Sequence, residues 1–389
     1  MNIIIISGII TEFNPFHNGH KYILEKAKEN SDFVVAIMSG NYVQRGEPAI
    51  FNKFTRAKAA LTCGADIVIE LPSPWSCSFA ENFAFGAISL LKDFNVNKLY
   101  FGAESNDIKK MLQIAKIDKN LKISNDKNKT YAVLRKNAIE ELLGEDTAKI
   151  LDMPNNNLAI EYIKAANKQK LDLEFIPIER IGAPHDSNVN ENGFASATHI
   201  RNLIIDDKPF FELVPPKLNG LYIDVLEQGK YLDYNKYSNA VLTYLRRIND
   251  FSHVPDIDTD LENRLKKALL KATNLEELLM SIKTKRYTLA RIRRIVLNAF
   301  LTNNNNYILK EVPYINVLGF TKKGEELLKI TAKQSKLPII IAMKPNIKLN
   351  SKTKKLLEEE VVRNDVYSSL LKSPDGCKID YTNGIIKME

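Results

Sequence analysis

Residues 12–20 read Glu-Phe-Asn-Pro-Phe-His-Asn-Gly-His, and they join an apolar run at residues 3–10 to a segment of helical periodicity at residues 20–28. The apolar run is continuous and rich in isoleucine, which is typical of a strand buried on both faces of a parallel sheet. A helix that begins just after such a strand presents free backbone N–H groups and a partial positive charge. This stretch therefore predicts an anion site suited to phosphate.

The same alternation continues along the chain. Further strands are predicted at residues 33–38, 67–71, 98–101 and 173–178, and helices at residues 53–63, 79–94 and 158–168. Repeated strand–helix units favour an α/β fold with a doubly wound, Rossmann-like parallel sheet. Sheets of this kind bind ligands at the carboxyl ends of their strands.

The pattern changes near residue 210. Helices are predicted at residues 237–249, 260–282, 288–301 and 323–335, with a late strand at residues 337–342. Prolines cluster between residues 205 and 235, which favours a linker there. We therefore expect a catalytic domain over residues 1–210 and a mainly helical domain over residues 211–389.

Charge is divided unequally between these two parts. Residues 1–210 hold 25 Lys and Arg against 26 Asp and Glu, a net charge of −1, and the remainder carries +9. Clustered cations gain free energy by displacing counterions from phosphates, so a polyanionic partner is expected for the second part. A lysine-rich solvated surface is the alternative.

Composition excludes several classes of protein. The chain has 389 residues and no run of 18 apolar residues, so no membrane span is expected. The apolar start lacks a basic segment before it and a cleavage site after it, which disfavours a signal peptide. The cysteines Cys63, Cys77 and Cys377 are few, scattered and odd in number, so we expect a reducing, cytoplasmic setting without a disulfide framework.

His17 and His20 lie one helical turn apart at the predicted helix start, and Gly19 between them permits a close backbone approach. Both rings could donate hydrogen bonds to the α- and β-phosphates of a nucleotide as charge develops during phosphoryl transfer. Lys21 could neutralise the α-phosphate or be an ordinary solvated helix residue. The histidines could instead be capping residues, or half of a zinc site that lacks its other ligands.

The His-Asn-Gly-His stretch resembles the HxGH motif of the nucleotidyltransferase superfamily. Members also carry a late Ile-Ser-Ser-Thr-x-x-Arg motif at a helix start, and residues 195–201 here read Ala-Ser-Ala-Thr-His-Ile-Arg. By this resemblance Ser196, Thr198 and Arg201 would hold the β- and γ-phosphates, although Ala195 and Ala197 depart from the motif. A capped helix with an exposed arginine is the alternative.

A closer resemblance is to the tRNA(Met) cytidine acetate ligase family. It is carried by residues 12–20, by Ser-Gly-Asn-Tyr-Val-Gln-Arg-Gly-Glu-Pro-Ala at 39–49, and by residues 64–72, 101–104, 154–156 and 285–294. The resemblance implies an enzyme that joins acetate to ATP, releases pyrophosphate and forms acetyl-adenylate. It further implies acetylation of N4 of the wobble cytidine of elongator tRNA(Met).

The resemblance also implies a set of nucleotide contacts. Asn155 and Asn156 stay open as alternatives, because Met153 and Asn157 around them depart from the expected pattern. Arg180 could instead be a surface arginine at a strand end. The implied ATP contacts are Ile10, Thr11, Glu12, Phe13, Asn14, Pro15, Phe16, His17, Asn18, Gly19, His20, Lys21, Tyr22, Ile23, Gly102, Asn155, Asn156 and Arg180.

The polar loop at residues 40–48 follows the second predicted strand, at the edge where ligands bind. Asn41, Gln44 and Arg45 are candidates to order acetate or the cytosine, and a purely structural loop is the alternative. Mg²⁺ is expected to accompany ATP, and no aspartate cluster indicates a metal site held by the protein.

Residues 280–310 contain no acidic residue. Apolar residues recur there at helical spacing, which leaves the basic ones largely off the buried stripe. Such a helix suits RNA backbone contacts, with Tyr287 available to stack on a base, while a solvated face is the alternative. The predicted RNA-binding residues are Lys283, Lys285, Arg286, Arg291, Arg293 and Arg294.

Two other functions compete with acetate ligation to tRNA. A small-molecule adenylyltransferase of cofactor biosynthesis would share both phosphate motifs but would not need a basic second half. A non-catalytic RNA-binding protein with a vestigial nucleotide fold is the other. The presence of both histidines together with Ser196, Thr198 and Arg201 disfavours the latter.

Overall fold

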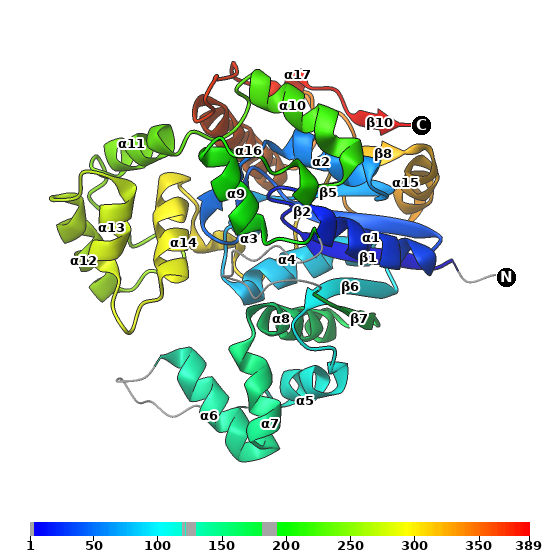
Figure 1. Cartoon of the computed structure of the whole chain (residues 1–389), viewed down its shortest axis with the longest axis horizontal. Coiled ribbons are helices and arrows are strands. Elements are labelled where there is room, and N and C mark those ends of the chain that lie inside the picture. Colours follow the sequence, from blue (N-terminus) through cyan, green and yellow to red (C-terminus); the bar gives the residue numbers. More distant parts are fainter. Residues whose placement is uncertain (1–3, 119–120, 122–129, 181–192) are drawn as a thin grey trace.

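The computed structural model describes residues 4–118, 121, 130–180 and 193–389 and places a mostly parallel sheet at the centre of the molecule (Figure 1). The strand order is β10-β8-β5-β2-β1-β6-β7, and β9 pairs with β8. The strands of this sheet are β1 (Ile6–Thr11), β2 (Phe33–Ser39), β5 (Ile67–Leu71), β6 (Lys98–Ala103), β7 (Glu174–Glu179), β8 (Ile315–Thr321), β9 (Ile339–Ile340) and β10 (Ile386–Met388). The predicted α/β fold with a doubly wound sheet is confirmed.

Chain order reverses at β1, because β2 and β5 lie on one side of it and β6 and β7 on the other. These five strands pair in parallel, so their carboxyl ends meet at one edge. A sheet of this type opens a crevice where the order reverses, and that is where its ligands bind. The stretch at residues 12–20 leaves β1 at this point.

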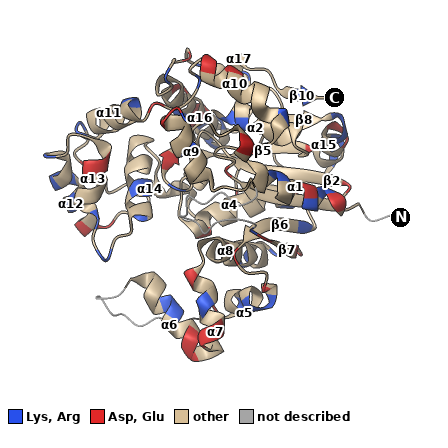
Figure 2. Ribbon diagram, viewed as in Figure 1, with Lys and Arg blue, Asp and Glu red and all other residues tan. Residues whose placement is uncertain are grey.

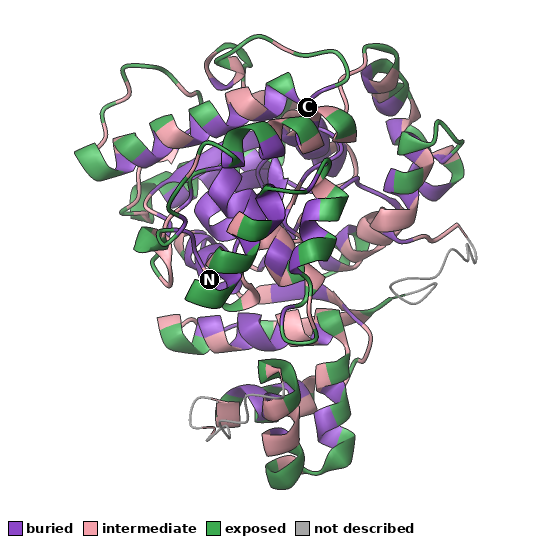
Figure 3. Cartoon of the chain, turned by 90° about the vertical axis from the view of Figure 1, so that its left-hand side faces the viewer, coloured by how far each residue is buried: buried purple, intermediate pink, exposed green. Residues whose placement is uncertain are grey.

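Helices cover both faces of the sheet. Alternate residues of β2 divide between two apolar cores: Val34, Ala36 and Met38 face one, and Val35 and Ile37 face the other. Helices α1 (Asn18–Glu29) and α2 (Lys53–Thr62) contribute to the first core. Helices α4 (Ala80–Asp93), α8 (Pro154–Gln169) and α15 (Lys322–Gln334) contribute to the second. Figure 3 shows the buried residues gathered in the middle of the molecule.

Smaller elements surround this core. A hairpin of β3 and β4 lies in the loop after β2, and α5, α6 and α7 form the lower lobe in Figure 1. The bounds are β3 (Tyr42–Val43), β4 (Glu47–Pro48), α3 (Ser73–Ser76), α5 (Ile108–Asp118), α6 (Tyr131–Leu143), α7 (Glu145–Ala148), α9 (Ala197–Ile205), α10 (Asn219–Glu227), α16 (Ser351–Ser369) and α17 (Ile379–Thr382). The 3-10 turns are η1 (Lys149–Asp152), η2 (Phe211–Leu213), η3 (Pro216–Leu218) and η4 (Asn305–Tyr307).

Four helices stand apart from the sheet at the left of Figure 1: α11 (Tyr234–Leu245), α12 (Thr259–Leu269), α13 (Leu275–Ile282) and α14 (Leu289–Phe300). The helix predicted over 260–282 is therefore two helices, since Asn274 caps the second one. The late strand predicted at 337–342 is the short β9. No helix among the described residues is long and apolar enough to cross a membrane.

The sheet crosses the boundary expected at residue 210. Strand β8 pairs antiparallel with β5, and β10 pairs with β8, so the end of the chain completes the sheet that its first half begins. The sequence analysis did not predict β8 or β10. The part that is helical and separate from the sheet is the stretch from α11 to α14.

Candidate active site

The turn between β1 and α1 holds the two predicted histidines. His17 is the N-cap of α1, and its Nδ1 accepts the N–H of Gly19 at 3.0 Å. His20 reaches back, so that its Nδ1 accepts the N–H of His17 at 3.3 Å. A Cβ at position 19 would lie 2.9 Å from Cε1 of His17, which explains the glycine there. The capping role considered for these histidines is therefore present, and it uses only one nitrogen of each ring.

This arrangement sets the chemistry of both rings. Burial lowers the pKa of His17 to about 3, with a further contribution from Arg180 and Arg201. Burial, His17 and Arg180 also hold the pKa of His20 well below its usual value. A neutral ring that accepts a hydrogen bond at Nδ1 carries its proton at Nε2. Two stacked imidazoles, with ring centres 3.7 Å apart, thus keep Nε2–H donors for a ligand.

The second predicted motif meets this turn across more than 170 residues of sequence. Ser196 caps α9 through its hydroxyl, and the guanidinium of Arg201 donates to the carbonyl of Asn14 at 2.8 Å. Arg201 also donates to Oγ1 of Thr198 at 3.2 Å and pairs with Glu47 at 3.0 Å. Since Arg201 is buried, the alternative of an exposed arginine is wrong.

The loop at residues 40–48 closes another side of the site. Its Gln44 N–H donates to the carboxylate of Glu12 at 2.9 Å, and Arg45 donates to Oγ1 of Thr198 at 3.4 Å. Burial raises the pKa of Glu12, while the nearby Arg45 acts to lower it. Two of the three predicted loop residues, Gln44 and Arg45, are therefore brought to the site.

Asn41, the third predicted loop residue, lies elsewhere. It is buried, its Oδ1 accepts the N–H of Lys53 at 2.7 Å, and its Nδ2 donates to Asn364 at 3.0 Å. With both polar atoms engaged inside the protein, Asn41 anchors the base of the loop rather than facing a substrate. For this residue the structural alternative fits better.

Arg56, which the sequence analysis did not single out, holds the edge of the sheet together. Its guanidinium donates to the carbonyls of Glu12 at 2.6 Å, Ser39 at 3.1 Å and Phe51 at 2.9 Å, and also to that of Gly40. Burial lowers its pKa to about 10, so it remains charged at pH 7. One buried cation thus fixes the ends of β1 and β2 and the loop between β2 and α2.

Two predicted nucleotide contacts, Gly102 on β6 and Arg180 just after β7, lie beside Ile23 of α1. A Cβ on Gly102 would come within 3.4 Å of Ile23 and 3.7 Å of the Arg180 side chain, so these three residues are neighbours. Arg180 is exposed at the end of β7. Its positive charge contributes to lowering the pKa values of both histidines.

Asn155 and Asn156 open α8, where Glu104 accepts both backbone N–H groups at 3.2 and 3.1 Å. Asn156 is fully buried, and its Oδ1 accepts the N–H of Glu104 at 3.1 Å. Asn155 is only half-buried, and its amide donates to Glu104 at 2.6 Å. Of the two alternatives, Asn155 is the more accessible to a nucleotide.

Among the described residues, the side chain of Asn14 has one polar atom without a hydrogen-bond partner. Its Oδ1 accepts the N–H of Ile50 at 2.8 Å, but its Nδ2 is buried and has no hydrogen-bond partner among the described residues. Buried amide donors are nearly always paired, by protein, water or ligand. This orphaned donor at the mouth of α1 favours a ligand with acceptor oxygens.

The remaining residues of the predicted stretch contribute in other ways. Asn18 donates to the carbonyls of Gly193 and Glu212 at 2.9 and 3.1 Å. Lys21 is half-buried and pairs with Glu25 at 3.0 Å, as an ordinary helix residue does, and its phosphate role stays a prediction. Tyr22 lies half-buried on α1. The residues packed into the strand, the turn or the core are Ile10, Thr11, Phe13, Pro15 and Phe16.

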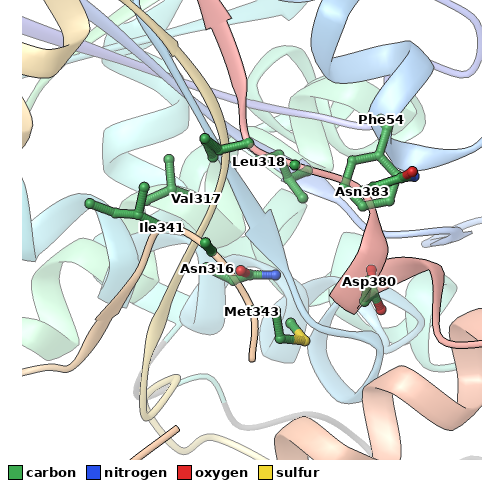
Figure 4. Close-up of a pocket in the computed structure, with 11 residues that line it drawn as sticks. Phe54, Asn316, Val317, Leu318, Ile341, Met343, Asp380 and Asn383 are labelled. Carbon is green, nitrogen blue, oxygen red and sulfur yellow. The ribbon is translucent and has the colours of Figure 1, made fainter. Parts of the chain in front are cut away.

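A small hollow beside β8 is separate from this site (Figure 4). Asn316, Met343 and Asp380 are among the residues that line it, and none of its lining residues belongs to α9 or to the β1–α1 turn. Asp380 also pairs with the buried Lys53 at 2.7 Å. A carboxylate in the lining disfavours an anion, so this hollow does not suit acetate.

The predicted RNA-binding helix is α14, and its charges are partly compensated (Figure 2). Arg291 pairs with Asp256 at 3.1 Å. Tyr287 is only 1% exposed, and its hydroxyl donates to Asp258 and to Asp260 at 3.2 and 3.0 Å. The base stack predicted for Tyr287 is therefore wrong in this structure, because hydrogen bonds to acidic residues of α12 and of the loop before it hold the side chain in a buried position.

Other basic residues of this region form no ion pair within the described part of the chain: Lys283, Lys285, Arg286, Arg293 and Arg294. Nε of Arg294 is buried without a hydrogen-bond partner there, and burial lowers the pKa of this guanidinium. Gly46 lies against the same turn of α14, since a Cβ at its left-handed φ of +84° would meet the N atom of Arg294 at 2.5 Å. Loop 40–48 therefore contacts the phosphate motif on one side and α14 on the other.

Comparison with known proteins identifies relatives along nearly the whole chain. The HIGH Nucleotidyl Transferase family model matches residues 4–380. The tRNA(Met) cytidine acetate ligase of Thermoanaerobacter sp. (strain X514) is 37% identical over 98% of this chain and 100% of that protein. The enzyme of the same name from Thermosipho melanesiensis is 39% identical over 86% of this chain and 84% of that protein.

Solved structures agree with these matches. Apo Thermotoga maritima TmcAL superposes with a TM-score of 0.92 at 30% identity, covering 99% of this chain and 100% of that one. The same protein bound with alpha-thio ATP superposes with a TM-score of 0.90 at 29% identity, with the same coverage.

Proposed function

The chain belongs to the tRNA(Met) cytidine acetate ligase family, and from this premise we propose that it forms acetyl-adenylate from acetate and ATP and then acetylates N4 of the wobble cytidine of elongator tRNA(Met). The observation that carries the proposal is the meeting of two motifs. The neutral histidine pair of the β1–α1 turn and the Thr198–Arg201 pair of α9 flank one helix mouth, joined by the hydrogen bond from Arg201 to Asn14. The Thermotoga relative binds an ATP analogue, which supports ATP as the co-substrate.

In the first step an acetate oxygen attacks the α-phosphorus, and the bond from that phosphorus to the bridging oxygen of pyrophosphate breaks. Acetate is already an anion at neutral pH, so no base is needed. The Nε2–H groups of His17 and His20 and the N-terminus of α1 donate to the phosphate oxygens, while Arg201 and Arg45 neutralise the departing pyrophosphate. Neutral N–H donors suit this role, because they stabilise charge on the phosphate oxygens through hydrogen bonds and transfer no proton.

In the second step N4 of the cytidine attacks the carbonyl carbon of the adenylate. The bond between this carbon and the AMP oxygen breaks, N4 loses one proton to water, and AMP leaves. The contacts of loop 40–48 with Glu12, Thr198 and α14 support a role for Gln44 and Arg45 in orienting acetate or the incoming base. Positioning supplies most of the rate in such a transfer.

Mg²⁺ would arrive with ATP, coordinated by phosphate oxygens. The described residues contain no group of three or more His, Cys, Asp or Glu that could hold a metal ion. The ion's contribution would be to neutralise charge on the leaving pyrophosphate. Both ATP and tRNA are cytoplasmic, and we propose this compartment.

Isotope exchange between pyrophosphate and ATP tests the first step. We expect exchange with the purified protein when acetate is present and none when it is omitted, because pyrophosphate can re-form ATP only from an adenylate. Exchange that ignores acetate would favour the small-molecule adenylyltransferase. Absence of exchange under all conditions would favour a vestigial nucleotide fold.

The tRNA step is tested by comparing alanine variants of two arginines of α14. Arg294→Ala is expected to raise the KM for tRNA about tenfold and to reduce the salt dependence of binding by about one unit of slope, as loss of one phosphate contact does. Arg291→Ala removes an ion pair with Asp256 and should change tRNA affinity by less than about threefold. Tritium-labelled acetate incorporated into tRNA gives the KM, and filter binding gives the slope.

Arg264→Ala is the matched control, since Arg264 is an exposed arginine that pairs with Asp260 on the neighbouring α12. It should leave both quantities unchanged. Equal losses in the Arg264, Arg291 and Arg294 variants would mean that only total charge matters. That result would contradict a specific contact by Arg294.

A further inference from the structure

A second pocket lies at the far end of α9. Ile204, Asp207, Phe210, Phe211, Tyr231 and Lys372 are among its lining residues. Thr198 and Arg201 of the phosphate site lie on the same helix, which at 1.5 Å per residue spans about 13 Å. One short helix therefore connects the pocket to the candidate active site.

The walls of this pocket are aromatic. The rings of Phe210 and Phe211 stack with centres 4.7 Å apart and an interplanar angle of 22°. Phe210 is buried, whereas Phe211 and Tyr231 are half-buried and so keep part of their surface accessible. Partly exposed aromatic side chains are the usual platforms on which unpaired bases stack.

The rim carries charges of both signs. Nζ of Lys372 donates to the hydroxyl of Tyr231 at 2.8 Å and lies 5.3 Å from the centre of that ring. Lys208 is exposed and pairs with Asp206 at 2.9 Å. The Asp207 carboxylate accepts no hydrogen bond from a described side chain or backbone group, and its residue has a left-handed φ of 54°. The rim thus combines two exposed lysines with one exposed carboxylate.

We infer that this pocket binds one unpaired nucleotide of the RNA substrate, close in sequence to the cytidine that is acetylated. The base would stack on Phe211 and Tyr231, its phosphate would contact Lys372 and Lys208, and an exocyclic amino group would donate to Asp207. About 13 Å corresponds to about four nucleotides stacked at 3.4 Å, and to fewer if the strand is extended, which keeps the nucleotide within the same loop of RNA. The inference rests on the proposed function, since it deepens the RNA contact of that enzyme.

Binding of a synthetic anticodon stem-loop of tRNA(Met), measured by fluorescence anisotropy, tests the pocket. Phe211→Leu keeps the apolar volume and removes the ring, and it should weaken binding by about tenfold. Lys372→Ala changes only an exposed side chain and should weaken binding by about threefold to tenfold, so it provides a second test if the Phe211 variant folds poorly. Lys329→Ala is the control, because this lysine is 70% exposed on α15 and pairs with Glu325.

Single abasic substitutions in the RNA loop locate the contact. At one position the abasic RNA should bind the wild type weakly, and Phe211→Leu should cause no further loss there, because the stacking partner is already absent. If the abasic substitution and Phe211→Leu weakened binding additively at every RNA position, the inference would be overturned. Equal RNA affinities of the Lys372 and Lys329 variants would also overturn it. Acetate-dependent ATP–pyrophosphate exchange should be unchanged in all three variants, so failure of the pocket is distinguishable from failure of the proposed function.

Discussion

His20→Ala is expected to lower acetate-dependent ATP–pyrophosphate exchange by about a hundredfold to a thousandfold, the usual cost of removing one pre-organised donor. The substitution removes the Nε2–H donor and also frees the N–H of His17, which His20 accepts at 3.3 Å. Affinity for tRNA should change by less than about twofold, because the predicted RNA contacts lie on and just before α14 and in the pocket at the far end of α9, not in this turn. Exchange and filter binding on the same preparation measure the two effects.

His253→Ala is the control for this experiment, since His253 is exposed in the loop before α12. It should match the wild type in both assays. If His20→Ala reduced exchange and tRNA binding equally, the proposed division between the phosphate turn and α14 would be untenable.

Arg201→Lys is expected to lower exchange by about a hundredfold, although it keeps the positive charge. The guanidinium contacts Asn14, Thr198 and Glu47 at once, and an ammonium group cannot reproduce that planar fork. The rate constant should fall more than the affinity for ATP, since the charge it neutralises grows as pyrophosphate leaves. Leaving buried groups without partners should also cost about 1–3 kcal/mol of unfolding free energy.

A matched variant separates these two consequences. Arg135→Lys disturbs a buried arginine of α6 whose guanidinium donates to both carboxylate oxygens of Asp118, each at 3.0 Å. It should lower stability to a similar extent and leave exchange intact. Thermal melts alongside exchange rates give the comparison, and similar exchange rates in the two variants would argue against a direct role of Arg201.

Local sequence was sufficient for the first half of the fold. Burial on both faces of the sheet demands continuous apolar residues, and β1, β2 and β5 each carry such a run. The turn at Gly19 can likewise be predicted from its own residues. The two phosphate motifs could be paired from the sequence, since both follow strands whose carboxyl ends share one edge. Their contact through Arg201 and Asn14 agrees with that prediction.

Tertiary neighbours account for what the sequence did not reveal. The basic run at residues 280–310 contains no acid, yet Asp256, Asp258 and Asp260 fold against it and engage Arg291 and Tyr287. Strand β8 joins the sheet after more than 240 residues of separation from β5, which no local pattern indicates. Arg56 lies in a helix next to alanines, and only the burial of its surroundings reveals that its partners are backbone carbonyls.

The proposed mechanism depends on one triphosphate held between the β1–α1 turn and α9. A crystal structure of this protein with a non-hydrolysable ATP analogue tests that claim most directly. We predict that Nε2 of His17 and of His20 will lie about 2.7–3.2 Å from α- or β-phosphate oxygens, with Arg201 and Thr198 on the opposite side of the same phosphates. A nucleotide bound elsewhere, or phosphates beyond hydrogen-bond distance of both histidines, would contradict it.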